Sequence, residues 1–169
     1  MDQYCNENAE AASLTLLDVG TGNGALLFKL TKKGIYSKVA NVCLRGVDYS
    51  ENSIMFADRV KQSLSTREDI AANLQADYAK IEFEHQDAFS LVDGGRYDII
   101  YDKGTFDVVY MNNELSNEGY AQAMHHRMNS SNPNAIFIIT SCNCTSEELD
   151  QIFCAQGLFQ KKFEIRGYR

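Results

Sequence analysis

The chain has 169 residues, of which 44% are hydrophobic and 23% are charged, and its 16 basic and 23 acidic residues give a net charge of −7. This composition is typical of one globular domain and excludes a collagen-like or disordered chain, and its apolar runs are far shorter than the roughly 20 residues that span a bilayer. The negative charge disfavours nucleic acid as a partner, because an acidic surface repels phosphate backbones.

The cysteines and the start of the chain bear on its compartment. The five cysteines are odd in number and include no Cys-x-x-Cys pair, which argues against a disulfide framework and against a zinc site. No basic start followed by an apolar stretch marks a signal peptide. We therefore expect a cytoplasmic protein with reduced thiols, no metal and no membrane partner.

Short apolar runs alternate with helical patterns along the chain. The apolar runs predict strands at residues 14–19, 41–48, 81–86, 97–101, 135–140 and 158–165. Apolar residues at helical spacing predict helices at residues 23–33, 50–63, 116–128 and 145–155, the last opened by a capping box of Thr145 and Glu148. Residues 67–80 are mostly polar or small and fit a surface helix or an insertion better than a core element. The alternation predicts an α/β fold, a doubly wound parallel sheet with helices on both faces.

A glycine-rich segment, residues 18–24 (DVGTGNG), joins the first predicted strand to the first predicted helix. Glycines at 20, 22 and 24 let the backbone turn tightly and approach a ligand closely. Residues 20–25 also satisfy the dinucleotide fingerprint in its G-x-G-x-x-A form, so a nicotinamide-dependent reductase remains an alternative. The third glycine and the carboxylate of Asp18 favour S-adenosylmethionine, whose cationic amino-acid end an acid at this position can face.

Acidic residues also follow the second and third predicted strands. Asp48 can accept both hydroxyls of a ribose, because its two oxygens offer bidentate geometry. Asp87 can accept a hydrogen bond from the adenine amino group while Ala88 or Phe89 packs against the ring. Ligands of open α/β sheets bind beyond the carboxyl ends of the strands, so these acids are candidates for one nucleoside site.

The fourth predicted strand ends in residues 102–107 (DKGTFD). Methyl transfer needs a nucleophile held in line with the sulfonium carbon, and a neutral amine if the acceptor is lysine. Carboxylates suit that task because they orient the incoming ammonium and help to remove its proton. A surface turn with an internal Lys–Asp pair is the structural alternative.

Four motifs in matching order and spacing resemble those of a known family: residues 17–24, 46–50, 102–107 and 139–143. Together they resemble the seven-β-strand, S-adenosylmethionine-dependent protein-lysine methyltransferases that act on translation elongation factor 1A. The first two motifs are shared by many methyltransferases and specify the cofactor only, whereas the last two are specific to the lysine-methylating branch. The resemblance implies a Rossmann-like sheet of the class I methyltransferase type and a methyl group transferred to a protein lysine.

The resemblance also assigns roles to individual positions. The residues that would bind the methionine part are Asp18, Gly20, Gly22, Asn23 and Gly24, while Asp48 and Tyr49 would hold the ribose and adenine and Asp87, Ala88 and Phe89 would close over adenine. Asp102 would face the methionine amino group and the transfer site as the catalytic residue. The acceptor channel would be shaped by Lys103, Gly104, Thr105, Phe106 and Asp107.

The sequence departs from the family pattern at three places. The family has Trp where this chain has Cys144, and a Trp-Phe-Gly-Glu stretch before the first strand that is not found in the 13 residues here. Only six strands are predicted, so the final strand of the seven is expected to be lacking. We therefore expect residues 1–169 to be a single methyltransferase domain truncated at both ends. The alternatives are another protein or small-molecule acceptor, or a cofactor-binding domain without activity.

Overall fold

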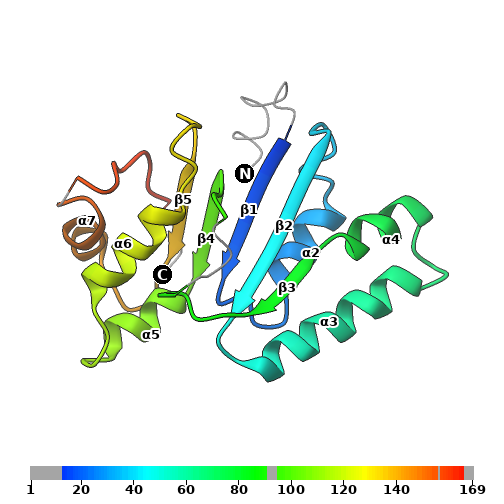
Figure 1. Ribbon diagram of the computed structural model, residues 1–169, viewed down its shortest axis with the longest axis horizontal. Helices are drawn as coiled ribbons and strands as arrows, with labels where there is room; N and C mark the ends of the chain where they lie inside the picture. Colours follow the sequence, from blue (N-terminus) through cyan, green and yellow to red (C-terminus); the bar gives the residue numbers. More distant parts are fainter. Residues whose placement is uncertain (1–12, 91–94, 156, 166–169) are drawn as a thin grey trace.

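The computed structural model describes residues 13–90, 95–155 and 157–165 (Figure 1). Its centre is a five-stranded sheet in the order β3-β2-β1-β4-β5, with every neighbouring pair parallel. The strands are β1 (Ser13–Val19), β2 (Asn41–Asp48), β3 (Glu82–His85), β4 (Ile99–Lys103) and β5 (Ile136–Thr140). The strand order reverses between β1 and β4, which is the switch point where open α/β sheets bind ligands.

In the part of the chain that the structure describes, six helices cover the two faces of the sheet. They are α2 (Ala25–Lys32), α3 (Glu51–Thr66), α4 (Ala72–Ala79), α5 (Thr105–Met111), α6 (Asn117–Arg127) and α7 (Ser146–Phe153). Helices α2, α3 and α4 bury their apolar residues in one core, and α5, α6 and α7 bury theirs in a second core. Strand β1 shows why the cores are separate: Leu16 faces the first and Leu17 the second, because successive side chains of a strand point to opposite faces. The predicted doubly wound α/β fold is confirmed.

Side-chain caps begin three of the helices. Ser50 accepts from the backbone N–H of Ser53 at 3.3 Å, and Ser116 accepts from that of Gly119 at 2.9 Å. Thr145 and Glu148 form the predicted capping box of α7. These caps bond backbone N–H groups that have no partner inside the helix.

One predicted element is wrong, and one helix was not predicted. Residues 158–165 are not a strand: in the described tail, Phe159 packs against Phe137 and Phe153 in the second core, so its apolar residues contribute by packing rather than by pairing. Residues 105–111 form α5, a helix too short to show a periodic pattern. Within residues 67–80, the expected surface helix forms as α4, and its Tyr78 side chain, only 3% exposed, anchors it in the first core.

Within the described ranges, no helix has the length and apolar character needed to cross a membrane.

A buried carboxylate joins the amino-terminal ends of β1 and β4. Asp98 accepts hydrogen bonds from the N–H and hydroxyl of Thr15, both at 2.9 Å, and from the side-chain amides of Asn129 and Asn132, both at 2.8 Å. Burial alone would raise the pKa of Asp98, but these four donors outweigh it and hold the pKa below its ordinary value. The network therefore fixes the loop before β5 to the centre of the sheet.

We predict that Asp98→Ala lowers the free energy of unfolding by about 2–4 kcal/mol at neutral pH, because it leaves four donors without their charged acceptor. Because the folded-state pKa is depressed, this stabilisation is present above the ordinary carboxyl pKa and is lost as the pH falls through the folded-state value. Urea unfolding at several pH values measures both effects. Asp69→Ala is the control, since Asp69 lies exposed beside Arg67, and it should leave the midpoint unchanged. Equal midpoints for the two variants would contradict the assignment.

Candidate functional site

The glycine-rich loop lies at the carboxyl end of β1, where it turns into α2. Gly20, Gly22 and Gly24 have φ values of 66°, 56° and 75°, the left-handed region that favours glycine. The N–H of Thr21 donates to the Val47 carbonyl at 2.9 Å, so the loop is fixed to the end of β2. The predicted strand-turn-helix context is confirmed.

Two of these glycines differ in what surrounds them. A Cβ atom added at Gly20 would lie 1.9 Å from the Thr105 hydroxyl oxygen, which itself donates to the Val19 carbonyl at 2.8 Å. A Cβ atom added at Gly22 would meet nothing within 4 Å. Gly20 therefore lets α5 contact the loop, whereas Gly22 borders open space in which a ligand can approach the backbone.

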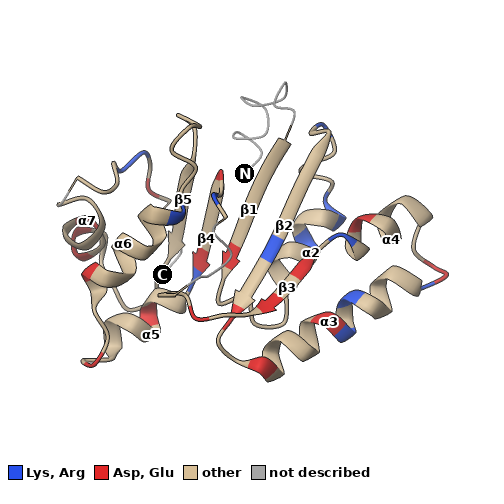
Figure 2. Cartoon of the chain, in the orientation of Figure 1, with Lys and Arg blue, Asp and Glu red and all other residues tan. Residues whose placement is uncertain are grey.

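Three carboxylates are buried at this edge of the sheet: Asp18, Asp48 and Asp102 are 4%, 9% and 0% exposed. The register explains their proximity, because Val19 pairs with Val47 of β2 on one side and with Asp102 of β4 on the other. Figure 2 shows acidic residues at the ends of these strands. The structure therefore brings together the three acids that the sequence placed at separate strand ends.

Asp18 is the least satisfied of the three carboxylates. The only side-chain hydrogen bond found for it in the described part of the chain comes from the Thr21 hydroxyl at 2.7 Å. Burial raises the pKa of Asp18 to about 7, with the Thr21 hydrogen bond and the charge of Lys103 acting in the opposite direction and the charges of Asp102 and Asp48 adding to the rise. A cation placed beside this group would favour its charged form.

Asp48 connects the glycine loop to the start of α3. One of its oxygens accepts from the Gly22 N–H and the other from the Ser50 N–H, each at 2.9 Å. A carboxylate offers about four acceptor positions, so each oxygen keeps capacity for a further donor. The neighbouring Tyr49 side chain is 80% exposed.

Asp102 faces the protein interior rather than the solvent. It accepts from the N–H groups of Thr105 at 2.8 Å and Phe106 at 3.0 Å, and from the Tyr120 hydroxyl at 2.6 Å. Burial raises the pKa of Asp102 to about 6, while these hydrogen bonds lower it. The carboxylate thus holds the first turn of α5 against α6, and its direct contact with an acceptor stays a prediction.

Asp107, the second acid of the DKGTFD motif, connects this motif to the segment that follows β5. Asp107 accepts from the Ser141 hydroxyl, from the Cys142 N–H at 3.0 Å and from the Asn143 N–H at 3.4 Å. Burial would raise the pKa of Asp107, but these donors outweigh it and lower the pKa. The two motifs that are most specific to the resembled family are therefore in direct contact.

The remaining predicted residues lie around the same edge. Asp87 is exposed and accepts from the Phe89 N–H at 3.0 Å, and Ala88 and Phe89 are partly buried against the second core. Asn23 is exposed and its side chain accepts from the Ala25 N–H at 3.1 Å.

Within the predicted acceptor channel, Lys103 is exposed and Gly104, with φ 84°, precedes α5. Phe106 is 0% exposed in the second core, so its side chain packs in the interior and does not face solvent. Cys144 is partly buried in the second core and its N–H donates to the Ser141 hydroxyl at 2.9 Å.

Sequence reasoning missed Tyr120. Its hydroxyl bonds Asp102, and its ring packs against Phe89, with ring centroids 5.6 Å apart, and against Phe106 at 5.5 Å. Tyr120 thereby joins the segment after β3 to the end of β4. In the sequence it is one apolar position of a predicted helix, and no local signal distinguishes it from an ordinary core tyrosine.

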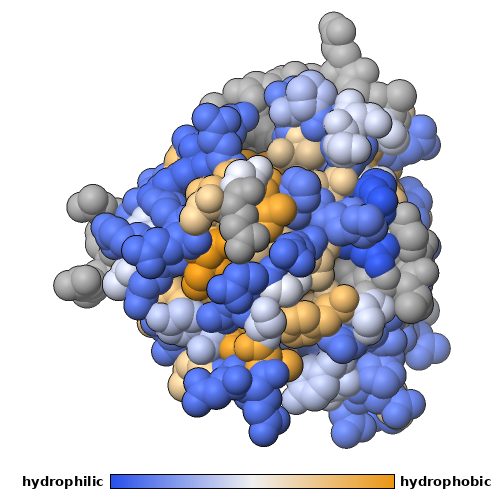
Figure 3. All heavy atoms as spheres, turned by 60° about the vertical axis from the view of Figure 1, so that its left-hand side comes forward, coloured by the Kyte–Doolittle hydropathy of each residue, from blue (hydrophilic) through white to orange (hydrophobic). Residues whose placement is uncertain are grey.

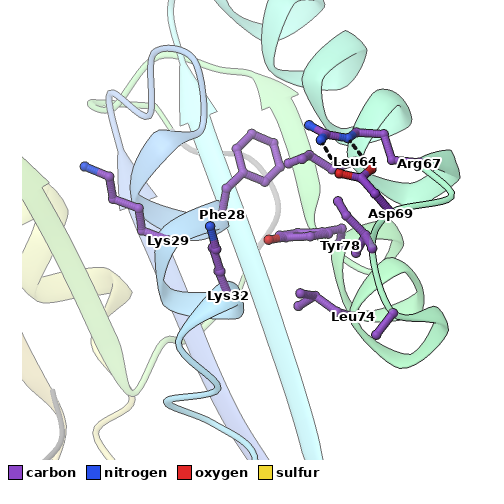
Figure 4. Close-up of a pocket in the computed structure, with 10 residues that line it drawn as sticks. Phe28, Lys29, Lys32, Leu64, Arg67, Asp69, Leu74 and Tyr78 are labelled. Atoms are coloured by element: carbon purple, nitrogen blue, oxygen red, sulfur yellow. Dashed lines mark hydrogen bonds and ion pairs between the residues drawn. The ribbon is translucent and has the colours of Figure 1, made fainter.

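A separate pocket of about 440 Å³ lies between α2 and the corner of α3 and α4 (Figure 4). Phe28, Leu64 and Tyr78 form apolar walls, and the side chain of Lys32 lies at its border. None of the predicted site residues is among the described residues that line it.

The fold and the acidic, glycine-lined edge define a methyltransferase-like domain, and the comparisons agree. The family model described as "Methyltransferase domain" matches residues 10–164, and the chain belongs to that family. The fold is also similar to solved methyltransferases, such as the O-methyltransferase domain of StiE (TM-score 0.59, 12% identity, covering 90% of this chain and 50% of that one). Coclaurine N-methyltransferase bound to N-methylheliamine and SAH gives a TM-score of 0.54 at 17% identity, covering 82% of this chain and 33% of that one.

Proteins that are similar in sequence indicate a narrower group of methyltransferases than the solved structures do. The chain is 34% identical over 158 residues to protein-lysine N-methyltransferase efm4 of Schizosaccharomyces pombe, which covers 89% of this chain and 60% of that protein. It is 32% identical to EEF1A lysine methyltransferase 2 of Danio rerio, covering 89% of this chain and 55% of that protein. The chain thus spans little more than half the length of these relatives.

We predict that Gly20→Ala and Gly22→Ala differ sharply, although both glycines have positive φ. Gly22→Ala should cost about 1 kcal/mol of unfolding free energy, from backbone strain alone. Gly20→Ala should cost at least about 3 kcal/mol, because the added methyl group collides with Thr105 and breaks its hydrogen bond to Val19. Chemical denaturation compares the two variants directly. Similar losses would show that the loop does not contact α5 as described.

Proposed function

We propose that the protein transfers a methyl group from S-adenosylmethionine to a lysine side chain of elongation factor 1A. The observation that carries this proposal is the set of three buried strand-end carboxylates beside the open Gly22 turn. The relatives support the acceptor, because one is a protein-lysine N-methyltransferase and the vertebrate one is an EEF1A lysine methyltransferase. We further propose that residues 1–169 belong to one domain and that it acts in the cytoplasm.

The residues present fit the proposed cofactor. Asp48 has acceptor capacity for two ribose hydroxyls, and the exposed Tyr49 ring and the Asp87–Phe89 turn would flank adenine. The open backbone at Gly22 and the carboxylate of Asp18 would receive the methionine part, with Asn23 and Gly24 completing the loop. Its ammonium group would supply the cation that the buried Asp18 lacks.

The residues at the end of β4 and the start of α5 would position the acceptor lysine. When bound, the cofactor supplies an activated methyl group on a sulfonium, and a neutral lysine amine must lie in line with it. Asp102 is proposed to act by holding the start of α5 and Tyr120 in place, and Asp107 by holding the 141–143 segment. Lys103 and Gly104 then border the path by which the acceptor enters.

Methylation of purified elongation factor 1A tests the function. The chain, S-adenosylmethionine and unmethylated elongation factor 1A should give one lysine whose mass increases by whole methyl groups, as measured by peptide mass spectrometry. Heat-denatured chain is the control. Cofactor binding without any methylated lysine would contradict the enzymatic proposal and favour a cofactor-binding domain, and a methylated acceptor other than this factor would contradict the acceptor.

We predict that Asp48→Ala weakens binding of S-adenosylhomocysteine by about 1.5–3 kcal/mol, or roughly 10- to 150-fold, because charged hydrogen bonds to the ribose are lost. Isothermal titration calorimetry measures the change. Asp69→Ala is the control, because it removes an exposed aspartate away from the candidate site and should leave the affinity unchanged. The chain should not bind NAD comparably. An unchanged dissociation constant for Asp48→Ala, or preferential NAD binding, would contradict the cofactor assignment.

A further inference from the structure

The outward face of α5 is apolar, the reverse of what a surface helix ordinarily shows. Val108 and Met111 are 63% and 69% exposed and lie three residues apart on one face of the helix, and Leu115, in the turn that follows α5, is 38% exposed. We name these three residues the α5 stripe. The inward face of the same helix is filled by Phe106 and Val109, so the stripe is not needed for the core.

The α5 stripe begins beside the candidate site. Helix α5 starts at Thr105, whose hydroxyl bonds the Val19 carbonyl next to the glycine loop. Val108 stands one turn further on, about 4.5 Å along the helix axis. Asp102 and Asp107 both bond the first turn of α5 to its surroundings from the inward side, so the stripe is presented on a firmly held helix.

The surroundings of the α5 stripe are acidic. No lysine or arginine occurs between residues 104 and 126, whereas Glu114 and Glu118 are exposed beside Leu115. Figure 2 shows red but no blue segments along α5 and the turn that follows it. Figure 3, which brings the α5–α7 side forward, shows hydrophobic atoms among hydrophilic ones on this side of the molecule, including its lower end.

We propose that the α5 stripe docks a basic segment of the protein substrate that carries apolar side chains next to the acceptor lysine. This proposal rests on the proposed function and adds the surface by which the acceptor protein is selected. Apolar contacts on Val108 and Met111 supply binding, and Glu114 and Glu118 match the positive charge that accompanies a lysine-bearing segment. A small-molecule acceptor would need no such surface outside the site.

Serine substitutions on the stripe test the proposal. Val108→Ser/Met111→Ser should weaken binding of elongation factor 1A about tenfold by biolayer interferometry and raise its KM by a similar factor. The melting temperature, the affinity for S-adenosylhomocysteine and the kcat at saturating acceptor should stay unchanged, because both side chains are exposed. Glu114→Lys/Glu118→Lys should also weaken binding, with a larger effect at low salt.

Met55→Ser/Phe56→Ser is the matched control, since these α3 residues are 47% and 54% exposed on another helix, and it should bind the acceptor normally. Normal acceptor binding by Val108→Ser/Met111→Ser would overturn the proposal. So would dimerisation in sedimentation velocity that this variant abolishes, because a second copy would then occupy the stripe. Stripe-dependent binding without methylation would uphold docking and refute the enzymatic proposal, whereas methylation of elongation factor 1A at an unchanged KM by Val108→Ser/Met111→Ser would refute docking alone.

Discussion

The burial of carboxylates at the carboxyl ends of neighbouring parallel strands is the constraint on which the rest of this structure depends. A buried charge must be matched by donors or by a cation, or its pKa rises and it binds a proton. Asp48 and Asp102 accept hydrogen bonds from backbone N–H groups of the glycine loop, the start of α3 and the start of α5, although burial still raises the pKa of Asp102 to about 6. These bonds fix the positions of the three segments around the edge. Asp18 is matched by one hydroxyl, and its raised pKa is the cost of keeping a place for a cation.

The same logic explains why two distant motifs occur together. Asp107 lies in the DKGTFD motif, and its oxygens collect donors from the hydroxyl and N–H groups of residues 141–143. Without residues 141–143, the buried Asp107 carboxylate would lose these donors. Through these bonds, the two motifs hold α5 against the segment that leads into α7. The apolar outward face of α5 is therefore carried by a helix that is fixed on its inward side.

Much of the fold was predictable because local patterns coincide with the core. Strands β1 and β2 were predicted within one residue, and the caps at Ser50 and Thr145 follow from side-chain chemistry at single positions. The features that the sequence did not predict depend on contacts between distant parts of the chain. Helix α5 is seven residues long and is held by Asp102 rather than by its own periodicity. Residues 158–165 alternate like a strand, yet Phe159 is used for packing. The role of Tyr120 depends on a contact 18 residues away in sequence.

The ionisation of Asp18 shows whether this edge of the sheet receives the cationic amino-acid end of the cofactor. The carboxyl carbon chemical shift of Asp18, assigned by comparison with Asp18→Asn, can be followed by NMR from about pH 4 to about pH 9. Without ligand, we expect the Asp18 carboxyl group to have a pKa of about 7. With saturating S-adenosylhomocysteine, whose ammonium favours the ionised carboxylate, this pKa should fall by at least about one pH unit. If the pKa of Asp18 does not change on saturation, the ammonium group of the cofactor does not bind beside Asp18.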